Sequence, residues 1–219
     1  MSVLRGFSLT ELLVVIAILA LLSSLLLPAI SSMMRGNQLT RGGEKLVSLL
    51  SLARQTAIAK NHSIEVRFYQ FGDPEVPGES AATPASGKYR AIQSFEIDDS
   101  GKATPIGKCE LMTPTIIMDS GATLSTLPAN LNINTFTNSL DPRVNIPRAG
   151  TNYICRAFRF LSDGSASSAG SANLSKSKPA TWFVTLHNIL DGDALTKAPT
   201  NYITVQIDPS SGSLKTWQP

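Results

Sequence analysis

The chain has 219 residues, enough for one ordinary domain plus a terminal element but too few for two large domains. Its 19 basic and 16 acidic side chains leave a net charge of +3 without a block of lysine or arginine, so charge alone does not indicate nucleic-acid binding. The two cysteines do not supply the spacing of a zinc site. Outside one apolar segment the sequence is polar and rich in Pro, Gly, Ser, Thr and Asn, which favours a loop-rich β domain.

The first element along the chain is an apolar segment at residues 7–30. As a helix it would be about 36 Å long, and a bilayer core is about 30 Å thick. No charged side chain lies between Leu12 and Met34, but Glu11 stands at the head of the segment. Inside hydrocarbon a carboxylate costs about 2.5–3.5 kcal/mol. We therefore expect Glu11 to have a partner.

Three simpler interpretations of this segment remain open. A secretory signal peptide would need an apolar run of about 7–15 residues and a cleavage site, which residues 29–31 could imitate. A plain membrane anchor explains the length of the segment but not its carboxylate. A Glu11 side chain that reaches the lipid headgroups explains the carboxylate but not the Gly6–Phe7 junction before it.

The stretch GFSLTELLVVIAILALL resembles the prepilin-type cleavage and methylation motif of type IV pilins and type II secretion pseudopilins. In that family a membrane peptidase cuts after a glycine, and the new first residue is N-methylated. The resemblance implies cleavage after Gly6, N-methylation of Phe7, an assembly role for Glu11 and a helix kink at Pro28. Cleavage before Phe7 would create a cationic amine, which Glu11 of a neighbouring subunit could neutralise in a filament.

The apolar period continues beyond this segment. Three glycines are expected to bend or melt the helix: Gly36, Gly42 and Gly43. An apolar stripe at helical spacing follows, made by Leu46, Leu49, Leu50, Ala53 and Ala57. Asn61 is a stop signal. We expect an amphipathic helix over residues 35–62, with an apolar face that a sheet must cover.

The period then changes to two, as in strands. Residues 63–71 alternate one face against another, with Ile64, Val66 and Phe68 opposed to Glu65, Arg67 and Tyr69. Residues 88–97 place four side chains on one face: Tyr89, Ala91, Phe95 and Ile97. Further strands are expected within residues 155–167, 180–187 and 202–217, the last as a hairpin. Residues 72–87 read as a flexible hairpin loop, and residues 130–152 show no clear period.

Three further stretches carry the resemblance. SLARQTAIAKNHSIEVRF resembles the helix-to-strand junction of H-type minor pseudopilins and FimT-like minor pilins, FRFLSDGSAS resembles their Phe-x-x-Asp-Gly turn, and ITVQIDPSSGSLKTW resembles their last hairpin. RFYQF, YRAIQSF and WFVTL also resemble the prepilin-like protein D of Verru_Chthon cassettes. The resemblance implies a pilin-like α+β fold. Its parts are a leader (1–6), a membrane and filament-core helix (7–34), an amphipathic helix (35–62) and an antiparallel β domain (63–219).

The sequence shows no active site. His62 and His187 lack a second histidine or a cysteine nearby, so we expect surface or half-buried side chains, and neither a metal site nor a cofactor. The Asp-Gly pairs are ordinary turn formers. Cys109 and Cys155 permit either one disulfide in an oxidising periplasm or two half-buried thiols.

The predicted function is that of a pilin-like subunit, not an enzyme. It would be cut by prepilin peptidase, lie in the inner membrane with its β domain in the periplasm, and assemble with other pilin or pseudopilin subunits. One alternative is a FimT-like DNA-binding minor pilin, for which four scattered lysines are available: Lys176, Lys178, Lys197 and Lys215. A second alternative is a membrane-anchored, exported binding protein or enzyme.

Overall fold

The structure is a computed structural model. It describes residues 8–80, 82–131, 133–134, 136, 140–141, 143–168 and 182–219, and it leaves out the side chains of residues 25–32. The chain divides into two units, Met1–Asn37 and Gln38–Pro219. Each unit is described by itself.

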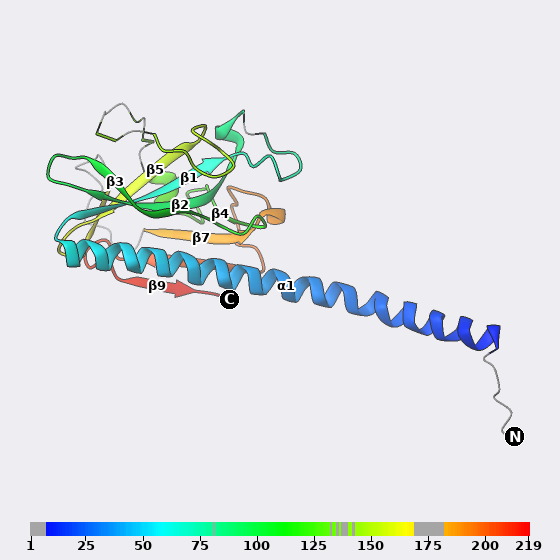
Figure 1. Cartoon of the computed structure of the whole chain (residues 1–219). Helices are drawn as coiled ribbons and strands as arrows, with labels where there is room; N and C mark the ends of the chain where they lie inside the picture. The colour runs from blue at the N-terminus through cyan, green and yellow to red at the C-terminus, as the bar shows by residue number, and fades with distance from the viewer. Residues whose placement is uncertain are drawn as a thin grey trace, which may run out of the picture. The chain divides into compact units, whose positions relative to one another are not determined.

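Helix α1 comprises residues Leu9–Lys60 and crosses the boundary between the units (Figure 1). The expected local melting at the glycines was wrong, because the helix continues through all three, whereas the expected bend stays a prediction. A Cβ atom on Gly43 would lie 2.8 Å from Cδ1 of Ile203, and one on Gly42 would lie 3.4 Å from Cγ2 of Ile116. These two glycines therefore allow the helix to approach the sheet closely. The helix ends at Lys60, and the next residue, Asn61, has a left-handed φ of 56°.

The described residues of the second unit form a nine-stranded sheet in which all pairs are antiparallel. The strands are β1 (Ser63–Phe71), β2 (Lys88–Ile97), β3 (Ala103–Leu111), β4 (Ile116–Met118), β5 (Ile154–Phe160), β6 (Ala166–Ser168), β7 (Phe183–Asn188), β8 (Tyr202–Ile207) and β9 (Leu214–Trp217). Their order is β6-β5-β1-β2-β4-β7-β8-β9, and β3 pairs with β2. Short helical turns are η1 (Pro84–Ser86), α2 (Thr126–Asn130) and η3 (Ile189–Asp191). The predicted α+β class, a helix packed on an antiparallel sheet, is confirmed.

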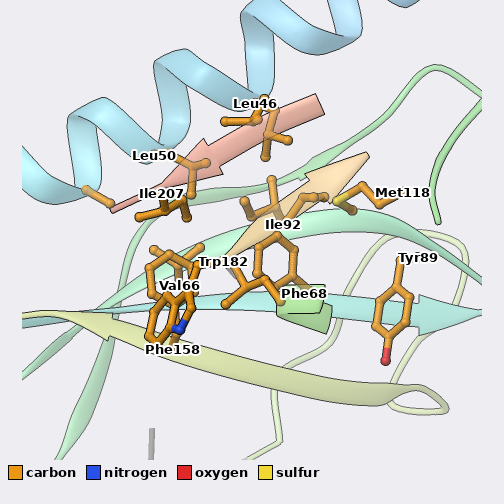
Figure 2. Packing of buried hydrophobic residues seen from close by; sticks show 14 of the residues in the cluster. Leu46, Leu50, Val66, Phe68, Tyr89, Ile92, Met118, Phe158, Trp182 and Ile207 are labelled. Carbon is orange, nitrogen blue, oxygen red and sulfur yellow. The ribbon is translucent and has the colours of Figure 1, made fainter. Parts of the chain in front are cut away.

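The main core lies between α1 and one face of the sheet (Figure 2). The predicted helix stripe is confirmed, since four of its five side chains are at most 2 % exposed (Leu46, Leu50, Ala53 and Ala57) and Leu49 packs at the margin. From the sheet come fully or nearly buried side chains that include Val66, Phe68, Phe158, Trp182 and Ile207. Burial of each such large side chain contributes about 1.5–3 kcal/mol. This packing holds the second half of α1 on the sheet.

The side chain of Tyr89 does not share a face with Ala91 as predicted. The register of β1 and β2 shifts between Tyr69 and Gln70, so that Tyr69 pairs with Ala91 whereas Gln70 pairs with Tyr89. Tyr89 consequently packs in the main core, and Ala91 packs on the opposite face with Tyr69. A one-residue irregularity of this kind reverses the side-chain direction, and the hydrophobic pattern alone does not reveal it.

The second face of the sheet is also covered. A ladder of alternating aromatic rings and guanidinium groups lies on it. The Arg67 guanidinium carbon is 3.8 Å from the ring centre of Phe95 and 5.6 Å from that of Phe136, and Arg143 is 4.9 Å from Phe136 and 5.0 Å from Tyr153. Each such contact contributes about 0.5–2 kcal/mol. The segment without a clear period thus covers the face that the strand alternation had marked as polar.

Three segments that are distant in sequence meet at one side chain of α1. Arg54 Nε donates hydrogen bonds to the carbonyl oxygens of Gly164 (3.2 Å) and Ser211 (3.1 Å). Gly164 lies in the β5–β6 turn and Gly212 in the β8–β9 turn, and both have positive φ, 81° and 64°. We call Arg54 and these two turns the Arg54 clasp. It joins three stretches that are far apart in the sequence: the end of α1, the Asp-Gly turn and the last hairpin.

Candidate functional site

Of the N-terminal residues with a predicted role, Gly6 and Phe7 lie outside the described residues. Cleavage after Gly6 and methylation of Phe7 therefore stay predictions. Pro28 lies within α1, but its side chain is among those not described, and the predicted kink is likewise untested. Glu11 is described, in the first turn of α1.

Glu11 and Ser8 form a reciprocal cap at the start of α1. The Glu11 carboxylate oxygen Oε2 accepts a hydrogen bond from the Ser8 backbone N–H (3.0 Å) and another from the Ser8 hydroxyl (2.8 Å). The Ser8 hydroxyl oxygen accepts one from the Glu11 backbone N–H (3.2 Å). This is the capping box in which Ser and Glu three residues apart satisfy each other's free backbone donors. Glu11 thus has one hydrogen-bonding partner, Ser8, within its own chain.

Beyond the cap, the side chains of residues 8–24 are all exposed in the single chain. Ten of them are large and apolar, namely Leu9, Leu12, Leu13, Val14, Val15, Ile16, Ile18, Leu19, Leu21 and Leu22. Among the described residues, no helix has an apolar stretch of the length needed to cross a bilayer. The single-pass membrane helix predicted for residues 7–34 is therefore not confirmed.

His187 is wholly buried, contrary to the expected surface or half-buried position. Its Nε2 lies 3.1 Å from Asp119 Oδ2, and its Nδ1 lies 3.0 Å from the carbonyl oxygen of Asn188. Burial by itself lowers the pKa of His187, but the hydrogen bond to Asp119 and the one to the Asn188 carbonyl outweigh it and raise the pKa. Both partners are acceptors, so both ring nitrogens can donate when the imidazole is protonated, and both are engaged in contacts within the fold.

The carboxylate of Asp119 is equally buried, and it is fully used by the fold. It accepts hydrogen bonds from His187 and from the backbone N–H groups of Gly121 and Leu195. Burial raises the pKa of Asp119, but these hydrogen bonds outweigh that effect and lower it. The Asp119–His187 pair therefore ties two loops to β7 rather than offering catalytic groups. His62, by contrast, is partly exposed and contacts Glu96 at 2.8 Å.

Arg67 is another wholly buried charge among the described residues, and the strand alternation had placed it on a polar face. It is 0 % exposed, and its Nε donates to Glu65 Oε1 at 2.7 Å while its Nη2 donates to Asp141 Oδ1 at 2.5 Å. Arg159 Nε donates to the other oxygen of Glu65 at 2.9 Å. Two cations thus face two carboxylates. The alternation of oppositely charged residues on one strand face was the available signal.

A second ion-pair network was also missed in the sequence. Asp73, 1 % exposed, accepts a hydrogen bond from Arg148 Nη1 at 2.8 Å. Arg90 Nη2 donates to Glu79 Oε1 at 2.6 Å, and Arg90 Nη1 is 3.6 Å from Asp73 Oδ2. These contacts tie the 72–87 loop, which the sequence marks as flexible, to β2 and to Arg148.

The disulfide considered for Cys109 and Cys155 is not formed in this structure, where both thiols are free. Cys109 lies on β3 and Cys155 on β5, and strands β2 and β1 lie between them. Three interstrand steps amount to about 14 Å, whereas bridged cysteines need Cα atoms within about 7 Å. Burial raises the pKa of Cys109 to about 12 and also raises that of Cys155, so neither thiol is activated.

Other ligand chemistry finds no support among the described residues. Within them, no three His, Cys, Asp or Glu side chains gather as a metal site would require. Two of the lysines considered for DNA binding, Lys176 and Lys178, lie outside the described residues. Lys215 is on β9, and Lys197 follows η3. DNA binding therefore rests on the sequence alone.

The match to a known protein family lies at the N-terminus of the chain. Residues 1–27 match the family model described as the prokaryotic N-terminal methylation motif. No curated protein matches the chain. Among solved structures, the minor pseudopilin EpsH from the type 2 secretion system of Vibrio cholerae is similar at 9 % sequence identity and a TM-score of 0.42, over 83 % of this chain and 98 % of that chain. The chain thus carries the N-terminal motif of the type IV pilin and pseudopilin superfamily, as its sequence predicted.

Proposed function

We propose that the chain is a pilin-like subunit, cut after Gly6 by prepilin peptidase, N-methylated at Phe7 and assembled through α1 into a type IV pilus or type II secretion-like filament, as a minor component. The observation that carries the proposal is the methylation motif at residues 1–27. The fold supports it, because an amphipathic helix half packed on a β domain leaves the other half of α1 available for assembly.

The exposed apolar side chains of residues 9–22 need cover. Each large aliphatic side chain left in water forgoes about 1.5–3 kcal/mol of burial, so ten of them do not stay in water. We infer that the inner-membrane lipid covers them before assembly, and that helices of neighbouring subunits cover them afterwards. The β domain then lies in the periplasm.

Glu11 supplies the directional contact in this proposal. Removal of the leader creates a cationic amine at Phe7, and Glu11 of one subunit pairs with that amine of its neighbour. Each charge offsets the desolvation of the other. Apolar helices can slide along one another at little cost, whereas an ion pair defines their register.

The proposal is tested first by the N-terminal mass of the membrane-extracted protein. The mature chain should begin at Phe7, keep 213 of the 219 residues and carry one extra methyl group. Gly6→Leu should leave the leader attached, because the peptidase must fit closely around that position. A mature terminus at Ser32 would instead show cleavage by an ordinary signal peptidase.

The second test concerns assembly. Glu11→Val should insert into the membrane and be cleaved as before, but it should lose its partner pilins, because removal of one member of a buried ion pair costs about 3–5 kcal/mol. Ile16→Val, an apolar change on the same exposed stretch, is the matched control and should retain them. Partners are measured by cross-linking in membranes. Equal recovery with Glu11→Val would refute the ion pair.

A further inference from the structure

A leucine is held out into solvent just after β7. Leu190 lies in η3 and is 72 % exposed, more than any other large apolar side chain among the described residues of the second unit. Its turn is fixed, because the Ile189 N–H donates to the Thr115 carbonyl oxygen (2.8 Å) and the Leu190 N–H donates to Asn188 Oδ1 (3.0 Å). Asp191 follows, and its exposed carboxylate forms no hydrogen bond or ion pair with the residues that the structure describes. We call Leu190 and Asp191 the Leu190 knob.

A hollow that fits such a side chain lies between α1, β2 and β3. Its apolar lining includes Leu49 and Leu52 of α1, Ile92 of β2 and Ile106 of β3. Its volume is about 40 Å³, which gives room for about three atoms the size of a water molecule, or the branched end of a leucine. We call it the Leu52 groove, after the side chain in its lining that is 56 % exposed.

The charges beside the knob and the groove are opposite. Lys108 of β3 lines the Leu52 groove, is exposed, and forms no hydrogen bond or ion pair with the part of the chain that the structure describes. Glu110 also lines the groove, but its carboxylate pairs with Lys45 at 2.6 Å. The ammonium group of Lys108 therefore complements the carboxylate of Asp191.

The knob and the groove of one chain lie far apart. Thr115, whose carbonyl oxygen holds Ile189, also donates its hydroxyl to Gln38 Oε1 of α1 at 2.8 Å. Leu52 lies about 21 Å further along that helix. A surface feature that fits a site elsewhere on the same molecule meets that site in another copy, and such a head-to-tail contact can repeat from copy to copy.

We propose that the Leu190 knob of one copy of this chain inserts into the Leu52 groove of a second copy, with Asp191 of the first beside Lys108 of the second. This inference rests on the proposed function, since the filament supplies the neighbouring copy. One leucine and one surface ion pair bury far less than the about 1,000 Å² of a stable interface. The contact therefore needs the high effective concentration of subunits that are already joined through α1, and the β domain alone stays monomeric.

The experiment uses the full chain in native membranes, with the partly exposed Cys109 replaced by Cys109→Ser. Two differently tagged copies are co-expressed, one with Leu52→Cys and the other with Leu190→Cys. Oxidation with copper phenanthroline should join them in a disulfide dimer that carries both tags. Glu44→Cys, exposed on α1 about 12 Å before Leu52, is the matched control. It should lose the dimer, because bridged cysteines need Cα atoms within about 7 Å.

Charge reversal tests the chemistry of the contact on the same dimer. Lys108→Glu in the copy with Leu52→Cys, or Asp191→Lys in the copy with Leu190→Cys, should lower the yield about three-fold, as expected for a surface ion pair. The two reversals together bring opposite charges back to the contact and should restore the yield.

Four outcomes overturn the proposal. They are absence of the dimer, an equal yield with Glu44→Cys, no recovery on double charge reversal, and a cross-link of Leu190→Cys to a different protein in place of the second copy. Failure of the proposed function is distinct, because the leader would then stay attached or Glu11→Val would keep its partners. If only the present inference fails, partner pilins are still recovered in a manner that depends on Glu11.

Discussion

The Arg54 clasp makes a quantitative prediction, because Gly212 has a close counterpart elsewhere in the chain. Gly212 and Gly101 both have positive φ, 64° and 84°. A Cβ atom on Gly101 would meet nothing within 4 Å, whereas one on Gly212 would lie 2.0 Å from the backbone oxygen of Gly164. That oxygen is one of the two that accept a hydrogen bond from Arg54. The same substitution at the two glycines therefore separates backbone strain from damage to the clasp.

The magnitudes follow from these contacts. Gly101→Ala should cost about 1 kcal/mol, the strain of a left-handed residue with a Cβ atom. Gly212→Ala should cost that amount plus the charged hydrogen bonding of Arg54, which contributes about 1.5–3 kcal/mol. We expect about 2.5–4 kcal/mol in all for Gly212→Ala, or a decrease in Tm of about 10 °C for a unit of this size. Gly101→Ala should lower Tm by about 3 °C.

The assay is urea unfolding of a fragment that begins at Arg35, and tryptophan fluorescence is used to monitor the unfolding. A double-mutant cycle with Arg54→Gln identifies the mechanism. In the Arg54→Gln background the clasp is already lost, so the cost of Gly212→Ala should shrink toward that of Gly101→Ala. Equal costs for the two glycine variants, or full additivity of Gly212→Ala with Arg54→Gln, would refute the clasp.

Three other predictions concern the same unit. A fragment that begins at Arg35 should elute from size-exclusion chromatography as a folded monomer, whereas one that begins at His62 should aggregate, because it lacks the helix face that covers the core. Since the His187 pKa is raised above 6.5 and that of Asp119 is lowered below 3.8, their pair should add most stability between about pH 4 and 6.5. Relative to His187→Gln, that gain should decline as pH rises through the raised His187 pKa, and a constant difference in unfolding free energy up to pH 9 would contradict the assignment. Arg67→Met should lose about 3–5 kcal/mol in urea unfolding, because its carboxylate partners stay buried without it.

The main core was predictable because its apolar residues follow the helical period in α1 and the alternating period in the strands. The 3.6-residue period of Leu46, Leu50 and Ala53 identified the buried face of the helix, and the alternation of Val66 and Phe68 identified the face of β1 that meets it. Both patterns are local. They depend only on which side of one element is apolar.

The second face could not be predicted in this way. Arg67 is buried because Phe136 and Asp141, about 70 residues later, cover it, and their segment has no period of its own. Strand β3 escaped prediction for a related reason. Pro105 and Gly107 interrupt its alternation, and its register against β2 shifts near Ile92. In each case a long-range contact overrides the local pattern.

The glycines of α1 weaken the helix by their low propensity, but they also allow it to pack closely on the sheet. Glycine is a weak helix former, and its presence favours a bend. Yet at Gly43 a side chain would collide with Ile203, so the missing Cβ atom is what lets helix and sheet meet. The helix continues through Gly43 although glycine costs about 1 kcal/mol there relative to alanine. The low helix propensity of glycine is visible in the sequence, whereas the close contact between Gly43 and Ile203 is not.

Glu11 has a local role in capping α1, but that role does not explain its charge. Its cap with Ser8 explains why an acceptor stands three residues after a serine at a helix start. A cap contributes about 0.5–2 kcal/mol, which offsets only part of the 2.5–3.5 kcal/mol that a carboxylate costs in hydrocarbon. A glutamine would serve Ser8 equally well at a lower desolvation cost, so capping gives no reason for the charge. The remaining cost requires a cation, and in the proposed filament the terminal amine of the neighbouring subunit supplies it.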